Sequence, residues 1–159
     1  MRFGAYPCLQ HQMRTWDTAI RVPGSPSDVL ELLTEPDAIA GWAPVPFEIV
    51  SLRGRRLVTG TRARIAGRLA GRAVEFDVTV FEASGERLTL AAHGPISIGV
   101  QYVVQAVSGG SDVRATVSVD GRGLFGRVLA SATEALLAAG ALRASLERLG
   151  RQLLPAETA

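Results

Sequence analysis

Few side chains in this chain could carry acid–base or metal chemistry. There are two histidines, His11 and His93, and one cysteine, Cys8. His93 alternates with the apolar Leu90 and Ala92, so we expect it at the solvent-facing end of a strand. Neither histidine stands in a His-x-Glu pattern or beside a cysteine cluster. We therefore expect no metal ion and no cofactor.

Nucleophilic chemistry has little more support. Lysine is absent, since all 17 basic residues are arginine, and this excludes a lysine Schiff base and a Walker A phosphate loop. Ser131 and Ser145 have no histidine at a suitable spacing. Tyr102 lies between Val100 and Val104 in an apolar stretch, where its hydroxyl would need a partner. Tyr102 is the remaining catalytic candidate.

Arginines gather over Arg53–Arg72, where no acidic residue occurs between Glu48 and Glu75. The cluster consists of Arg53, Arg55, Arg56, Arg62, Arg64, Arg68 and Arg72. Two interpretations remain open: the solvated face of a hairpin, or a docking patch for an anionic surface or an acidic carrier protein. The net charge of +2 does not indicate nucleic acid binding.

Alternating apolar and polar residues predict most of the elements that would position these groups. Strands are expected over residues 14–22, 47–53, 61–69, 72–82, 86–93, 96–107 and 113–120. Most of them have one apolar and one polar face, which is typical of an antiparallel sheet covered on one side only. Two short helices are expected after the first strand, the first capped by Ser25 or Ser27.

One long helix, over about residues 124–153, should supply the remaining cover. Counting 100° per residue predicts an inner face of Phe125, Val128, Leu129, Ala132, Leu136, Ala139 and Gly140. The same count predicts an outer face of Arg127, Glu134, Ala138, Ala141, Ser145, Arg148 and Gln152. Small residues on the inner face favour either close packing on the sheet or a space for a ligand.

Length and composition favour one globular domain. A chain of 159 residues with 47% hydrophobic residues can form a real core. We expect an extension over 1–13, a domain over 14–154 and a tail over 155–159. No apolar run reaches the roughly 18 residues of a membrane span, and the start does not look like a signal peptide. A cytoplasmic monomer or homodimer is expected.

The sequence resembles the helix-grip superfamily, which includes START lipid-transfer domains, the birch pollen allergen and polyketide aromatase/cyclases. The resemblance is carried by "VPGSPSDVLELLTEPDAIAGW", the strands of "GTRARIAGRLAGRAVEFDVTVFEASGERLTL", the hairpin "YVVQAVSGGSDVRATVSV" and the terminal helix. Bacterial polyketide cyclase/dehydrase and lipid-transport proteins are the most similar members. The resemblance implies an α+β fold in which a curved sheet of six or seven strands grips the long helix around a deep cavity.

The apolar face of the strands would line that cavity. The expected lining is Trp42, Phe47, Phe76, Val78, Leu90, Ile98, Tyr102, Val104, Val117, Leu129, Ala132, Thr133, Leu136 and Gly140. Binding of a hydrophobic small molecule, such as a lipid, an isoprenoid or a polyketide-like compound, is the function that this lining favours. The alternatives are a polyketide aromatase/cyclase or dehydratase, with Tyr102 in the reaction, and an interaction module that uses the arginine-rich hairpin.

Overall fold

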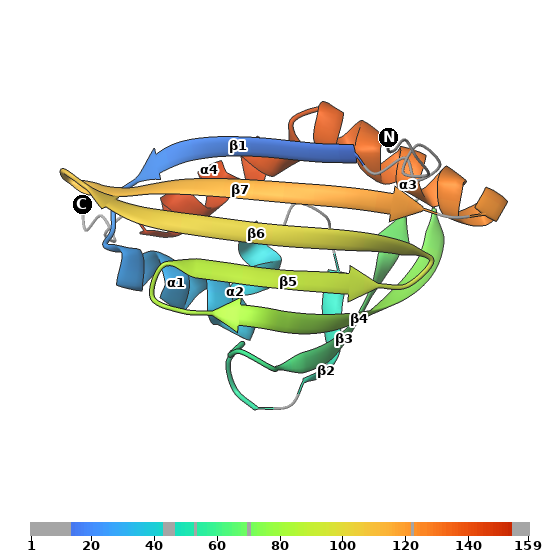
Figure 1. Cartoon of the computed structure of the whole chain (residues 1–159), viewed down its shortest axis with the longest axis horizontal. Helices are drawn as coiled ribbons and strands as arrows, with labels where there is room; N and C mark the ends of the chain where they lie inside the picture. The colour runs from blue at the N-terminus through green and yellow to red at the C-terminus, as the bar shows by residue number, and fades with distance from the viewer. Residues whose placement is uncertain (1–13, 43–46, 53, 70, 122, 154–159) are drawn as a thin grey trace, which may run out of the picture.

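The computed structural model describes residues 14–42, 47–52, 54–69, 71–121 and 123–153 (Figure 1). In chain order the elements are β1 (Arg14–Val22), α1 (Pro26–Thr34), α2 (Pro36–Trp42), β2 (Phe47–Leu52), β3 (Arg62–Leu69), β4 (Arg72–Ala83), β5 (Arg87–His93), β6 (Ile96–Val107), β7 (Gly110–Gly121), α3 (Gly123–Ala138) and α4 (Ala141–Leu153). The expected extension and tail, together with Arg53, lie outside the described residues.

The seven strands form one antiparallel sheet with the order β1-β7-β6-β5-β4-β3-β2. All connections between β2 and β7 join neighbouring strands, while β1 closes the far edge beside β7. Figure 1 shows the sheet as a curved layer, with α1 and α2 behind its middle strands and α3 and α4 along the edge formed by β1 and β7. This arrangement confirms the expected α+β helix-grip fold.

Side-chain alternation explains why only one face of the sheet is covered. In β4, Val74, Phe76 and Val78 are buried, whereas Glu75 and Asp77 between them are exposed. Successive side chains of a strand point to opposite faces, so the apolar set faces the helices and the charged set faces solvent. The expected alternation of β4 is confirmed.

The first two helices are positioned by a capped turn directly after β1. Ser25 is the N-cap of α1: its hydroxyl accepts from the Asp28 backbone N–H at 3.2 Å, and Asp28 accepts from the Ser25 backbone N–H at 3.3 Å. Pro26 occupies the first turn, where a missing N–H costs nothing. The cap turns α1 back so that Val29 and Leu33 are fully buried under the sheet.

The expected long helix is present over its expected length, but it is interrupted before residue 141. Gly140 has φ of 97°, a left-handed conformation that favours glycine, and its N–H donates to the Leu137 carbonyl at 3.1 Å. α3 therefore ends and α4 begins on a new axis. None of the helices in the described part of the chain combines the length and apolar character needed to cross a membrane.

Several predicted orientations in the C-terminal helices are wrong. Leu136 and Gly140, expected to line the cavity, are exposed, and Leu137 is buried in their place. α3 is apolar on nearly every side, so periodicity could not fix its rotation. At the start of α3, Gly121 lies against the Gly126 carbonyl without room for a Cβ atom, so the helix packs closely on the end of β7 there. Beyond the break, Ser145 is fully buried rather than exposed.

Replacing Gly140 with alanine tests the interruption. A Cβ atom at φ of 97° strains the backbone although no neighbouring atom lies within 4 Å, so we expect Gly140→Ala to lower the free energy of unfolding by about 1–2 kcal/mol. Urea denaturation measures this. Gly85→Ala is the matched control, because its Cβ also meets nothing within 4 Å and its φ is ordinary. Equal stability of the two variants would contradict the account.

Candidate ligand cavity

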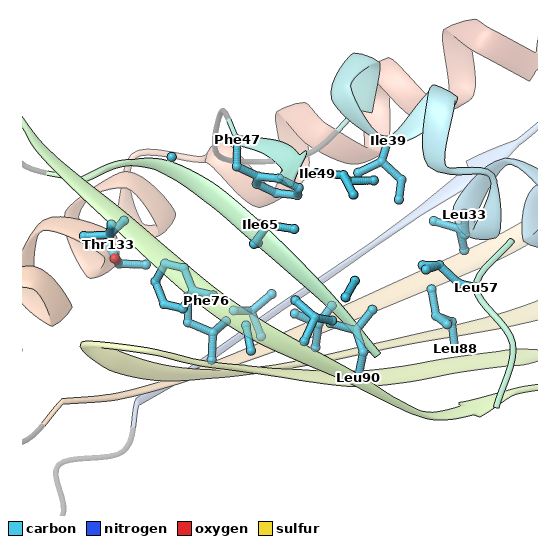
Figure 2. A pocket seen from close by; sticks show the side chains of 18 of the residues that line it. Leu33, Ile39, Phe47, Ile49, Leu57, Ile65, Phe76, Leu88, Leu90 and Thr133 are labelled. Atoms are coloured by element: carbon cyan, nitrogen blue, oxygen red, sulfur yellow. The ribbon is translucent and has the colours of Figure 1, made fainter. Parts of the chain in front are cut away.

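A cavity of about 170 Å³ lies between the apolar face of the sheet and helices α1, α2 and α3 (Figure 2). Its wall is formed by Leu33, Ile39, Phe47, Ile49, Leu57, Ala63, Ile65, Gly67, Arg68, Val74, Phe76, Val78, Leu88, Leu90, Ala92, Ile98, Val100, Tyr102, Val117, Thr133 and Leu137. Leu33, Leu57 and Leu88 lie at one end, and Phe76 and Thr133 lie at the other.

Strand register brings these side chains together from distant parts of the sequence. Leu90 in β5 pairs with Val100 in β6, which pairs with Val117 in β7. Paired residues of neighbouring strands lie on the same face of a sheet. A shift of one residue in the pairing of a strand would move its apolar side chains to the solvent-facing side of the sheet. The strand register therefore determines which residues border the cavity.

Many of the residues expected to line the cavity do border it. These are Phe47, Phe76, Val78, Leu90, Ile98, Tyr102, Val117 and Thr133. Val104 and Leu129 are instead in the packed core, with 1% and 0% of their surface exposed. Ala132 is half-buried and does not border the cavity. The side chain of Trp42 lies outside the described part of the structure.

Other wall residues were missed, although the sequence contained signals for most of them. Ala63 and Ile65 already belonged to the apolar face of an expected strand, and Leu33 to the apolar face of the first short helix. Leu57 carries no such signal, because it lies between β2 and β3. Its N–H donates to the Thr34 carbonyl at 3.0 Å, which ties this connection to the end of α1.

Tyr102 has a structural environment that argues against a role as a general base. Only 2% of its surface is exposed. Burial raises the pKa of its phenol well above the ordinary value, and a hydrogen bond with the Ser145 side chain opposes this rise only in part. Tyr102 thus keeps its proton at physiological pH. Because Ser145 belongs to α4, the bond links β6 to that helix.

Two further polar residues border the cavity. The Thr133 hydroxyl, on α3, donates to the Leu129 carbonyl at 3.0 Å and is 2% exposed as a residue. Arg68 is exposed, and its guanidinium donates to the Gly71 carbonyl at 2.8 Å across the β3–β4 turn. Among the described wall residues there is no histidine and no carboxylate.

His93 lies on the opposite, solvent-facing side of the sheet. It is exposed, and its Nδ1 lies 3.4 Å from the Ser97 hydroxyl. The position agrees with the expected solvent-facing strand end. His93 therefore has no access to a molecule in the cavity.

The positive charge of the arginine cluster is partly neutralised by acidic residues that lie outside the cluster in the sequence but close to it in the fold. Arg64 lies 3.1 Å from Asp77 and 3.6 Å from Glu75, both on the neighbouring strand β4. Arg56 lies 3.0 Å from Glu35 at the end of α1. These pairs reduce the uncompensated positive charge of the hairpin, and docking of an anionic partner here stays a prediction.

A curved antiparallel sheet that holds helices over an apolar cavity defines a helix-grip protein. A model of the polyketide cyclase/dehydrase and lipid transport family matches residues 13–153. The chain belongs to this family. None of the curated proteins compared with it matches.

Solved structures with the same fold have distant sequences. An aromatase/cyclase from Streptomyces sp. R1128 matches with a TM-score of 0.66 at 15% identity, over 93% of this chain and 100% of that one. Protein TTHA0849 from Thermus thermophilus matches with a TM-score of 0.65 at 19% identity, over 91% of this chain and 100% of that one. Ara h 8.0201 matches with a TM-score of 0.57 at 13% identity, over 86% and 97%. At these identities the similarity shows the fold alone.

Replacing Tyr102 with phenylalanine tests its role as a link between β6 and α4. At pH 8 we expect Tyr102→Phe to lower the free energy of unfolding by about 1 kcal/mol, the net value of a buried hydrogen bond. Above pH 10 the unfolded chain ionises Tyr102 while the folded chain keeps it protonated, so the unfolded state binds fewer protons. Wild-type stability then falls by up to about 1.4 kcal/mol per pH unit relative to the variant.

Urea denaturation between pH 8 and pH 11 measures this difference. Ser145→Ala is the control: it loses the same hydrogen bond but retains the buried phenol, so it should keep the steep loss of stability above pH 10. A constant difference between wild type and Tyr102→Phe across this range would contradict the burial of the phenol.

Proposed function

We propose that the protein binds a small, mainly apolar molecule in the cavity between the sheet and helices α1 to α3. The observation that carries this proposal is the cavity itself, with about 170 Å³ of space and a largely apolar wall. Concave, apolar sites with few polar groups are typical of small-molecule binding. Membership of a family described by lipid transport as well as cyclase activity is in accord with such a role.

Energetics support a binding role over a packing defect. An enclosed, empty cavity costs about 24 cal/mol per Å³, which for 170 Å³ sets an upper bound of about 4 kcal/mol. Small domains are stable by only about 5–15 kcal/mol in total, so this cost is a large fraction. A ligand that fills the space recovers the lost contacts, and this recovery is the driving force that we assign to binding.

Cavity volume limits the size of the ligand. An apolar cavity of about 150 Å³ accommodates benzene. A single-ring aromatic or a short isoprenoid therefore suits the 170 Å³ observed here. A long acyl chain or a multi-ring polyketide exceeds this volume.

The wall chemistry favours binding over catalysis. Enolisation or dehydration of a polyketide-like substrate needs a base near the reacting carbon. Tyr102 stays protonated because burial raises its pKa. The described wall residues include no histidine and no carboxylate that could activate the Thr133 hydroxyl. We therefore assign the cavity a carrier or sensor role.

A matched pair of valine substitutions tests the proposal. Val100 borders the cavity, whereas Val128 is 54% exposed on the outside of α3. We expect wild type and Val128→Phe to bind 4-fluorotoluene in ¹⁹F NMR titrations. Val100→Phe fills part of the space and should weaken binding at least tenfold. Native mass spectrometry of protein from its own host should also show a bound apolar molecule.

Two results would contradict the proposal. One is the absence of any binding of 4-fluorotoluene to wild type. The other is equal binding by Val100→Phe and wild type, which would locate the ligand elsewhere on the protein.

A further inference from the structure

Thr133 is a polar residue on an apolar wall, and its hydroxyl has a defined donor role. It lies at the α3 end of the cavity together with Phe76 (Figure 2). With 2% of its surface exposed, the residue has almost no access to bulk water. Any partner for the remaining hydrogen-bonding capacity of its hydroxyl must come from the protein or from a molecule in the cavity.

The internal hydrogen bond of Thr133 fixes what the hydroxyl can offer. Its single hydrogen is donated to the Leu129 carbonyl at 3.0 Å, within the same helix. A threonine hydroxyl has one donor hydrogen and two acceptor lone pairs. With the hydrogen engaged, the Thr133 hydroxyl has only acceptor capacity left.

The two other polar side chains on the wall are engaged in different ways. The Tyr102 hydroxyl bonds with Ser145 on α4. The Arg68 guanidinium bonds to the Gly71 carbonyl and is exposed. Thr133 is thus the polar residue on the wall whose donor hydrogen is already used within its own helix.

We propose that Thr133 Oγ1 accepts a hydrogen bond from a hydroxyl group of the bound molecule. The ligand class is then a neutral alcohol or phenol of about one ring in size. A ketone or an ether has only acceptor oxygens, which would face the lone pairs of Thr133. Such a ligand could form a hydrogen bond with Thr133 only if the hydroxyl stopped donating to the Leu129 carbonyl. This inference rests on the proposed function, since it assigns the ligand chemistry of the same cavity.

Three probes of similar size and different hydrogen-bonding chemistry test the proposal. 4-Fluorophenol carries a donor hydroxyl, 4-fluoroanisole a methyl ether, and 4′-fluoroacetophenone a carbonyl acceptor. Dissociation constants from ¹⁹F NMR are compared between wild type and Thr133→Val, which keeps the shape and removes the oxygen. For each probe, the ratio of its dissociation constants for the two proteins cancels the contribution of that probe's hydrophobicity.

We expect Thr133→Val to weaken 4-fluorophenol binding about three- to tenfold, the range for one net hydrogen bond. Binding of 4-fluoroanisole and 4′-fluoroacetophenone should change less than twofold. Thr133→Ser, which keeps the hydroxyl, should retain the preference for 4-fluorophenol over 4-fluoroanisole. Thermal denaturation checks that each variant is folded, and Thr133→Ala replaces Thr133→Val if the latter does not fold.

The contrary outcomes separate this inference from the proposed function. If Thr133→Val weakens the binding of 4-fluorophenol and 4-fluoroanisole equally, or weakens the binding of 4′-fluoroacetophenone most, the acceptor role of Thr133 is overturned. The cavity would still bind its probes in that case. If no probe and no 4-fluorotoluene binds wild type, the proposed function fails as well.

Discussion

The apolar face of the seven-stranded sheet is the constraint on which the rest of this structure depends. Alternation directs Phe76, Val78, Leu90 and Val100 to one side, and burial of that side is the main source of stabilisation. Helices must therefore cover the face, and all four lie on that side (Figure 1). A cavity of about 170 Å³ remains between that face and the helices, so covering the face does not fill all the space beneath it.

The break at Gly140 gives the two halves of the C-terminal segment different roles. α4 is strongly amphipathic, and its Leu142, Leu146 and Leu149 are 2%, 0% and 0% exposed. It packs closely and is held to β6 by the bond between Ser145 and Tyr102. α3 contributes Thr133 and Leu137 to the cavity wall. Its small residues bring it close to the end of β7 without filling the space.

The sequence predicted the sheet and its apolar face because strand alternation is a local signal. Seven of the eight expected residues that border the cavity follow from that signal or from the helical count. Ile65 carries the same strand signal, although the expected lining did not include it. The rotation of α3 and the burial of Ser145 could not be predicted in the same way. A helix that is apolar on most sides has no periodicity to fix its rotation, and one left-handed glycine resets the count for all that follows.

Diffraction from crystals under xenon pressure tests the central claim most directly, because xenon enters apolar cavities without needing any polar partner. The account predicts a xenon site in the space bordered by Phe76, Val100 and Thr133, with the surrounding side chains unmoved. Close packing of α3 onto the sheet, with no xenon between Thr133 and the strands, would contradict it.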